Sequence, residues 1–220
     1  MGQIGRSSDL ERDLTLTATE HARLLAVLDR FTEAEQLDLS EPSTLPGWSR
    51  GHVITHLADN AIGHIRIFDA AAEGRVGEQY PGGREARAAG IEAGSSLPAT
   101  EQLDRLRRSI RDLEGRWDSS AWEGHGIGIT ETLPIRDLPF LRLREVDIHL
   151  IDLDVGIGFA DLPPEYLRLE LGRMTMLWQA RQPMGMTQLP QLALNATPEV
   201  RLAWLMGRCE IDELEPALSY

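Results

Sequence analysis

Histidines and an acidic residue recur at ligand-type spacings in two segments that are far apart in the chain. Residues 48–57 contain His52 and His56, and residues 144–149 contain Glu145 and His149. Within each pair the spacing is four residues, which places both side chains on one face of a helix. Two imidazoles and a carboxylate are the ligand set of a catalytic zinc-type site, with one position left open for water or substrate. If the two segments pack together, they form a metal site.

Helical spacing alone does not choose between the two histidines of the first segment. His52, His56 and Asn60 follow one another at intervals of four, so both rings point to roughly the same face. One histidine packed in the core and the others in solvent would give the same pattern. Two histidines and a carboxylate suit Zn²⁺ best, and also suit Fe²⁺, Ni²⁺ or Co²⁺. The spacing therefore predicts a divalent-metal site but does not decide whether His52 or His56 is its first ligand.

The composition of the chain restricts its partners. The 220 residues are 42% hydrophobic and 26% charged, which is typical of a globular protein with a sizeable core. The net charge of −13 argues against nucleic acid, because phosphate binding needs clustered Lys and Arg. A few local arginines could still bind a small anionic substrate. No apolar run is long enough for a membrane span, so no membrane partner is expected.

The cysteine content and the N-terminus both indicate a cytoplasmic protein. Cys209 is the single cysteine, so it cannot form an internal disulfide, which fits a reducing compartment. Residues 1–10 are polar and have no apolar stretch of the kind found in a secretory signal peptide. The sequence leaves the oligomeric state open between a monomer and a homodimer.

Periodic apolar residues predict a mostly α fold. Amphipathic helices are expected over residues 10–32, 49–73, 99–118 and 137–153. Four such helices indicate a four-helix bundle. The glycine-rich stretch 74–98 reads mainly as a long loop with a short helix near 85–91.

The character of the chain changes after the fourth predicted helix. Further helices are expected over 163–181 and 198–206, with a short strand at 191–194 between them. The predicted organisation is a metal-binding bundle over residues 1–158 and a small α/β lobe over residues 159–220.

The two histidine-containing segments resemble a known family. The run Leu-Pro-Gly-Trp-Ser-Arg-Gly-His-Val-Ile-Thr-His-Leu at residues 45–57 resembles the second-helix signature of the DinB/YfiT-like metalloenzymes. More closely, it is similar to the mycothiol-dependent maleylpyruvate isomerases of actinobacteria. In that family the second histidine of the pair is the metal ligand, which implies His56. His52 and Asn60 are then candidates for supporting contacts. The run Arg-Glu-Val-Asp-Ile-His at residues 144–149 implies that Glu145 and His149 complete the set.

The resemblance extends to two arginines. Glu-Ala-Arg at residues 85–87 looks like a loop arginine region of the family, and Gly-Arg at 207–208 looks like its C-terminal Gly-Arg. Both imply substrate binding, by Arg87 and Arg208. The chain departs from the family pattern at Asp147, where an aromatic residue is common. That carboxylate either adds charge to the pocket or faces solvent.

The resemblance implies a metal- and mycothiol-dependent cis–trans isomerase of gentisate-type aromatic degradation, which converts maleylpyruvate to fumarylpyruvate. A metal-bound thiol loses its proton near neutral pH. The thiolate would add to the cis double bond, the resulting single bond would rotate, and elimination would give the trans isomer. Cys209 is a poor source of that thiol, because an isolated cysteine behaves as a small hydrophobic residue. The expected partners are therefore an external thiol, mycothiol, and a small dicarboxylate substrate.

Two other functions fit the same residues. The first is a thiol S-transferase on the same scaffold, which would use the metal without the rotation and elimination steps. The second is a non-catalytic, stress-associated metal-binding protein.

Overall fold

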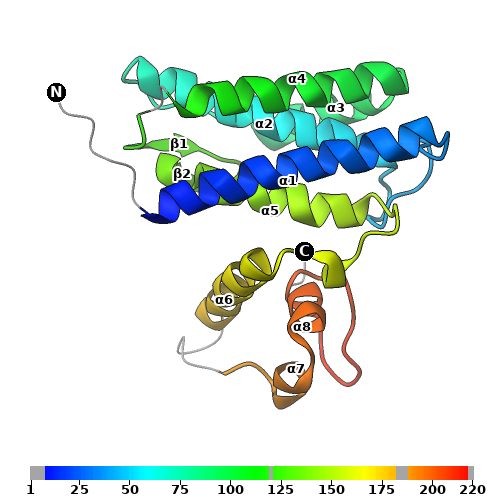
Figure 1. Ribbon diagram of the computed structural model, residues 1–220. Coiled ribbons are helices and arrows are strands. Elements are labelled where there is room, and N and C mark those ends of the chain that lie inside the picture. The colour runs from blue at the N-terminus through cyan, green and yellow to red at the C-terminus, as the bar shows by residue number, and fades with distance from the viewer. Residues whose placement is uncertain (1–7, 119–120, 182–187, 218–220) are drawn as a thin grey trace. The chain divides into compact units, whose positions relative to one another are not determined.

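The chain forms two compact units in the computed structural model, residues 1–155 and residues 156–220 (Figure 1). The structure describes residues 8–118, 121–181 and 188–217. Residues 1–7, which carry most of the expectation that no signal peptide is present, lie outside these ranges. The boundary predicted from sequence lay between residues 158 and 159.

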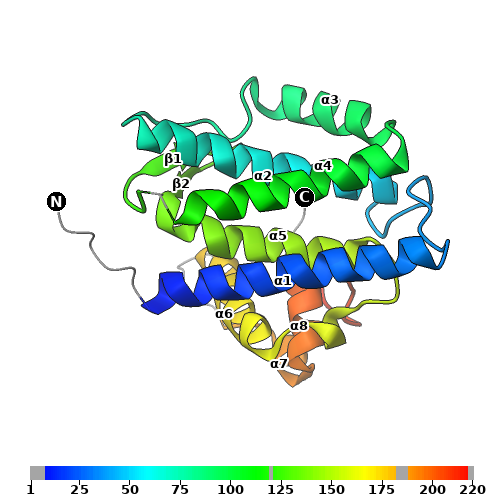
Figure 2. The same cartoon turned by 45° about the horizontal axis from the view of Figure 1, so that its top comes forward.

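The first unit is a helical bundle with one small hairpin. Its elements are α1 (Ser8–Glu33), α2 (Arg50–Ala72), α3 (Gly83–Ser95), α4 (Ala99–Trp117), β1 (His125–Ile127), β2 (Thr132–Pro134), the 3₁₀ turn η1 (Ile135–Asp137) and α5 (Leu138–Asp152). Helices α1, α2, α4 and α5 form the bundle, in which α2 packs against both α4 and α5, and α1 packs against α5 (Figure 2). The predicted mostly α fold with a four-helix bundle is confirmed.

Helix α2 is the central element, because it also contacts α3 and β1. Val53, Ile54 and Leu57 on this helix are fully buried. The helix α3 that packs on α2 is longer than the short helix predicted near 85–91. Gly94 permits that packing, since a Cβ at this position would lie 2.4 Å from Thr55 Cγ2.

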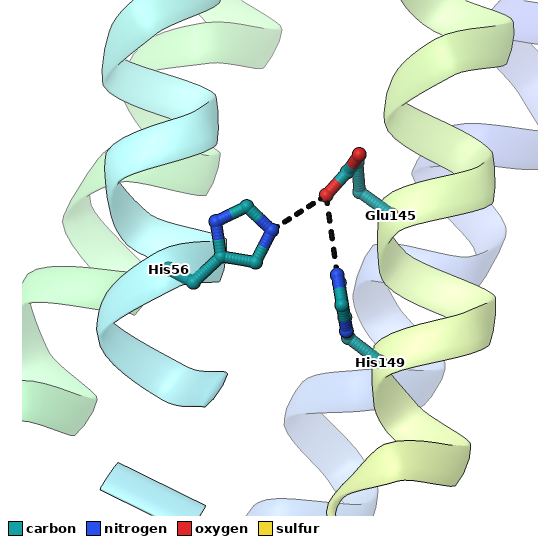
Figure 3. A group of neighbouring side chains, drawn as sticks. All are labelled: His56, Glu145 and His149. Atoms are coloured by element: carbon teal, nitrogen blue, oxygen red, sulfur yellow. Dashed lines mark hydrogen bonds and ion pairs between the residues drawn. The ribbon is translucent and has the colours of Figure 1, made fainter. Parts of the chain in front are cut away.

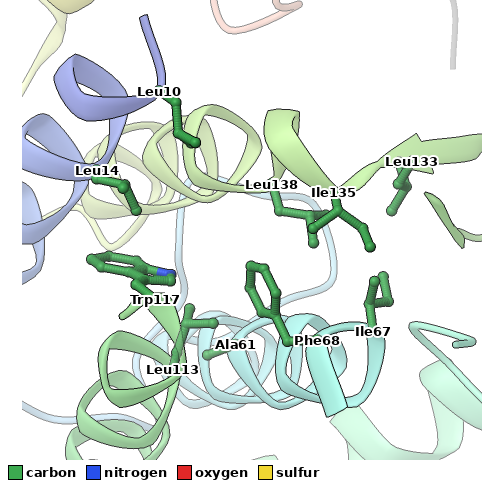
Figure 4. Close-up of a cluster of buried hydrophobic side chains, with 10 residues drawn as sticks. All are labelled: Leu10, Leu14, Ala61, Ile67, Phe68, Leu113, Trp117, Leu133, Ile135 and Leu138. Atoms are coloured by element: carbon green, nitrogen blue, oxygen red, sulfur yellow. The ribbon is translucent and has the colours of Figure 1, made fainter. Parts of the chain in front are cut away.

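An apolar cluster fills one end of the bundle (Figure 4). Its members are Leu10, Leu14, Ala61, Ile67, Phe68, Leu113, Trp117, Leu133, Ile135 and Leu138. They come from α1, α4, the β2–α5 region and the second half of α2. The predicted ligands on α2 lie in its first half, so the polar residues and this cluster occupy different parts of the same helix.

The hairpin closes against the segment that follows α2. Strands β1 and β2 are antiparallel, with Gly126 opposite Leu133. Ile127 accepts a backbone hydrogen bond from Gln79 and donates one to Gly77. This pairing fixes the backbone directly before Tyr80.

The second unit contains η2 (Phe159–Asp161), α6 (Pro164–Ala180), α7 (Gln191–Asn195) and α8 (Pro198–Leu205). The strand predicted at 191–194 is wrong, because these residues form α7. Proline at 190 fits a helix start, and Arg201 donates to the carbonyls of Ala193 and Leu194, which the helix itself leaves unpaired. In the ranges described for this unit, every regular element is helical, so the predicted α/β character is not seen there.

No helix in the described ranges is both long enough and apolar enough to cross a membrane.

Candidate metal site

Three side chains converge between α2 and α5 (Figure 3). His56 projects from α2, and Glu145 and His149 lie one turn apart on α5. His56 Nε2 lies 2.8 Å from Glu145 Oε2, and His149 Nε2 lies 3.4 Å from the same oxygen. One candidate ligand atom from each residue lies within 4.8 Å of the others. The two segments singled out in the sequence therefore pack together, with three donors close enough for one ion to bridge.

The protonation states of these groups suit a cation. Burial lowers the pKa of His56 to about 4, so this ring is neutral at pH 7. Burial raises the pKa of Glu145, but hydrogen bonds with His149 and His56 outweigh it and hold that pKa well below its usual range. Burial likewise lowers the pKa of His149, but Asp152 and Glu145 outweigh it and raise that pKa. An ionised carboxylate beside a neutral imidazole is ready to bind metal, and the ion would compete with the proton on His149.

Asp152 orients the His149 ring from behind. His149 Nδ1 donates to Asp152 Oδ2 at 2.8 Å, and Asp152 is fully buried. Thr44 Oγ1 donates to the other carboxylate oxygen at 3.0 Å. A carboxylate on the far nitrogen of a histidine ligand fixes its tautomer and raises its basicity. Asp152 thus aims His149 Nε2 at the group, and Thr44 connects the loop before α2 to this arrangement.

Asp152→Asn is expected to weaken Zn²⁺ binding about 10- to 100-fold with little change in fold, because the amide supplies no negative charge to His149. A competition titration with a chelating dye measures the Kd. Asp154→Asn is the matched control, since Asp154 is exposed two residues away. Equal Zn²⁺ affinity in Asp152→Asn and wild type would contradict this role.

His52 is not part of the group, because its ring is engaged at the start of α2. Ser49 caps the helix by accepting from His52 N–H, and Ser49 N–H donates to His52 Nδ1 at 3.2 Å. The other ring nitrogen lies 3.2 Å from Glu92 Oε2 on α3. This reciprocal capping box satisfies backbone donors that the helix leaves free. His56, the histidine implied by the resemblance, is therefore the one of the two that lies with Glu145 and His149.

Comparison with known families identifies the bundle. Residues 17–154, more than half of the chain, match the family model of the mycothiol maleylpyruvate isomerase N-terminal domain. The chain belongs to this family. The predicted family, its DinB-like fold and the prediction of an isomerase enzyme are therefore confirmed.

Solved structures agree with this assignment to the maleylpyruvate isomerase family. A crystal structure described as the mycothiol-dependent maleylpyruvate isomerase superposes with a TM-score of 0.77 at 24% identity, covering 91% of this chain and 90% of the other. At that identity the likeness shows a shared fold. A histidine-to-alanine mutant of an enzyme with the same description has a TM-score of 0.70 at 28% identity, covering 78% and 72%. A search of curated proteins returned no match.

Beside the metal group, the isomerase-family bundle contains a buried polar network centred on Arg142. Arg142 is fully buried, and it donates to Asn60 Oδ1 at 3.0 Å and to His21 Nε2 at 3.0 Å. His21 Nδ1 lies 2.8 Å from Glu114 Oε1. Since a guanidinium can only donate, His21 Nε2 accepts and Nδ1–H donates to Glu114. Asn60 thus supports Arg142.

Tyr80 connects this network to Arg87. It hydrogen-bonds with Arg87 and Asn60, and burial raises its pKa. The Arg87 guanidinium also lies over the Tyr80 ring, 5.5 Å from its centre. Sequence reasoning missed Tyr80 and Arg142. For Arg142 a signal existed, because it precedes Glu145 by three residues and so lies on the same side of α5.

Buried neutral histidines make the metal-free bundle sensitive to acid. Burial lowers the pKa of His64 to about 3 and that of His21 to about 4, against about 6.5 in an unfolded chain. At pH values between the folded and unfolded pKa, these histidines bind protons in the unfolded chain but not in the folded chain. Stability contributed by the neutral rings is therefore complete above pH 6.5 and falls as the pH drops towards 4, by up to ~1.4 kcal/mol per unit for each ring.

With chelator present, His64→Gln is expected to reduce the pH dependence of the unfolding free energy. From pH 7 to pH 5 the loss of stability should be smaller than in wild type by ~2 kcal/mol. Urea denaturation at the two pH values measures it, and His125→Gln on the exposed hairpin is the control. An unchanged slope in His64→Gln would show that His64 does not stay neutral in the fold.

The structure places the other predicted residues as follows. Arg87 on α3 is half-buried, and its Nη2 lies 3.1 Å from His56 Nδ1. Arg208 belongs to the second unit, shortly after α8, where its Nη1 donates to the Met206 carbonyl.

Both alternatives expected for Asp147, a charge in the pocket or a solvent-facing side chain, are wrong. This residue is buried on the α1 side of α5, 3.9 Å from Arg23 Nη1.

Proposed function

We propose that this protein is a metal- and mycothiol-dependent isomerase that converts maleylpyruvate to fumarylpyruvate. The observation that carries the proposal is the convergence of His56, Glu145 and His149 in a chain of the maleylpyruvate isomerase family. The proposal keeps the cytoplasmic location expected from sequence, since a reducing compartment keeps a thiol cofactor reduced.

The donor set fits a catalytic divalent cation. His56, Glu145 and His149 offer two nitrogens and one oxygen, which leaves room for a further ligand, and Zn²⁺ is the ion that suits this set best. Asp152 adds the outer carboxylate that such histidines commonly have. When bound, the cation would supply Lewis acidity that lowers the pKa of a thiol and provides a thiolate near neutral pH.

The reaction needs no net proton transfer. The thiolate electron pair forms a C–S bond to the alkene carbon β to the ketone, and the π electrons move to the keto oxygen as an enolate. The former double bond is now single and can rotate. The enolate then re-forms the ketone and the double bond, the C–S bond breaks, and the thiolate leaves from the trans isomer. Donors at the keto oxygen would stabilise the enolate.

Arg87 is proposed to bind the dicarboxylate substrate. Its guanidinium can only donate, so in the metal-free arrangement His56 Nδ1 accepts and His56 Nε2–H donates to Glu145. A cation on Nε2 requires the proton to sit on Nδ1, where it would face the Arg87 N–H. Metal binding is therefore expected to release Arg87, whose planar fork can then pair with a carboxylate.

Arg87→Gln is expected to raise KM for maleylpyruvate about 10- to 100-fold with a smaller change in kcat, because a charge-assisted hydrogen bond contributes ~1.5–3 kcal/mol. Steady-state kinetics at saturating thiol measure both constants. Arg84→Gln is the matched control, since Arg84 is exposed on the same helix. If both variants shift KM equally, Arg87 has no specific role.

Arg208 is the second proposed substrate residue. Its support is the Gly-Arg pair after an apolar helix, where Gly207 adopts φ +67° and ends α8. Substrate binding by Arg208 stays a prediction.

The test of the function follows the two isomers by absorbance. Purified protein loaded with Zn²⁺ is mixed with maleylpyruvate, with and without mycothiol. The proposal expects fumarylpyruvate to form only when mycothiol is present, while the free thiol concentration stays constant. Consumption of thiol without interconversion of isomers would identify an S-transferase. Absence of either reaction would contradict the proposed function.

A further inference from the structure

A pocket of about 520 Å³ lies at the start of α2 and in the loop before it. It is formed by the loop from Ser40 to Ser49, excluding Glu41, and by His52. Trp48 is the wall that the pocket shares with the site, because its ring lies 5.7 Å from the His56 ring and 6.1 Å from the His52 ring, centre to centre. The volume is in the range of sites that bind small molecules.

The loop that forms the pocket is held in one shape. Pro42 and Ser49 pair as an antiparallel bridge, and Trp48 N–H donates to the Leu45 carbonyl. Between these last two residues, Pro46 and Gly47 form the centre of a tight turn, with Gly47 at φ +78°. Proline followed by glycine at positive φ is the signature of a type II turn. The turn presents the Trp48 ring from a preformed hairpin.

The same loop is tied to the metal helix. Thr44 N–H donates to the Asp152 carbonyl at 2.9 Å, and Thr44 Oγ1 donates to the Asp152 carboxylate that orients His149. The pocket and the candidate ligand His149 are therefore joined through two hydrogen bonds at a single residue.

The chemistry of the pocket lining selects an uncharged polar ligand. Among its residues there is no Asp, Glu, Lys or Arg. The serines at 40, 43 and 49 and Thr44 contribute hydroxyl groups, each with two acceptor lone pairs, and Trp48 contributes a half-buried aromatic surface. A dicarboxylate has no cation to pair with here, and a nucleotide has none for its phosphates. A sugar, with apolar ring faces and many hydroxyls, matches both features.

Resting on the proposed function, we infer that this pocket binds the sugar portion of mycothiol. Mycothiol is an N-acetylcysteine joined by an amide to a glucosaminyl-inositol, so the part that carries no sulfur is an uncharged polyol. The sulfur would lie at the metal group, and the sugars would pack against the face of Trp48 that lines the pocket. The substrate would lie on the other side of the metal group, next to Arg87.

The test separates the sugar from the sulfur. Ser40→Tyr fills the pocket from an exposed position, and Trp48→Leu removes the aromatic wall. Both variants are expected to raise KM for mycothiol about tenfold. Ser40→Tyr should leave KM for N-acetylcysteine within about twofold, because it blocks only the sugar contacts. Thr100→Tyr, which adds the same bulk at an exposed site on α4, should change neither constant.

A binding measurement makes the result independent of catalysis. Saturation-transfer NMR is recorded on metal-free protein with N-acetylglucosaminyl-inositol, which has no sulfur and, like the sugar portion of mycothiol, carries its glucosamine nitrogen as an uncharged amide. Signal in wild type and its loss in Ser40→Tyr support the pocket even if maleylpyruvate is not isomerised, in which case the proposed function fails alone. No signal in wild type, or equal KM shifts for both thiols in Ser40→Tyr, overturns the sugar site while leaving the isomerase intact.

Discussion

Glu145→Gln is expected to lose stoichiometric metal and to lower kcat/KM by about a thousandfold or more, because a bound cation contributes several kcal/mol to the reaction. Glutamine has the shape of glutamate but no charge. It leaves His56 and His149 without the anion that both now contact, at 2.8 Å and 3.4 Å. Elemental analysis after purification without chelator gives the metal content, and the isomerisation assay gives the rate.

Two comparisons make the Glu145 result specific. Glu101→Gln, on the exposed first turn of α4, should retain full metal and activity. Chelator-treated wild type should match the rate of Glu145→Gln and recover on adding Zn²⁺, whereas the variant should not recover. A variant that keeps its metal, or loses metal without losing activity, would show that Glu145 is not a functional ligand.

Arg142→Met is expected to destabilise the bundle by ~3 kcal/mol, although methionine is more easily buried than arginine. Removing the guanidinium removes the free-energy cost of burying its charge, but it leaves His21 Nε2 and Asn60 Oδ1 without their donor. Each buried polar group left unsatisfied costs ~1–3 kcal/mol, and Glu145 also loses a nearby positive charge. Urea denaturation of the metal-free protein measures the loss.

The source of the Arg142 effect can be isolated with a double variant. The His21 ring stacks on Trp117, 6.1 Å away centre to centre. His21→Phe keeps a ring in this position and removes the nitrogen that accepts a hydrogen bond from Arg142. The double variant should be less destabilised than the sum of the single variants, since both polar partners are then absent. Arg108→Met on the exposed face of α4 should change stability little. Additive losses would mean that packing, and not the hydrogen bond, explains the effect.

The convergence of His56, Glu145 and His149 could be predicted from sequence because helical spacing carries most of its geometry. Glu145 and His149 had to share a face of α5, and the amphipathic patterns of α2 and α5 turned both rows inward. The choice between His52 and His56 needed either the family resemblance or the cap. Ser49 followed three residues later by His52 has the spacing of a capping box, a local signal that assigns His52 to the helix start.

Long-range hydrogen bonding could not be predicted in the same way. Spacing puts Arg142 on the same side of α5 as Glu145, but its partners on α1 and α2 cannot be read from the sequence. The burial of Asp147 likewise follows only once Arg23 of α1 is known to lie near it. The strand prediction at 191–194 was wrong because it, too, depended on contacts with distant residues. A four-residue apolar run fits a strand or a helix, and contacts from Arg201 accompany the helix seen here.

Cobalt substitution tests most directly the proposal that His56, Glu145 and His149 would hold a cation that lowers the pKa of a thiol. Co²⁺ replaces Zn²⁺ in such sites, and a thiolate bound to Co²⁺ produces a sulfur-to-metal charge-transfer band that neither component has alone. We predict that titrating the Co²⁺ protein with mycothiol produces this band, saturating at one thiol per protein, and that Glu145→Gln shows none. Stoichiometric cobalt and active isomerisation without such a band would contradict this proposal.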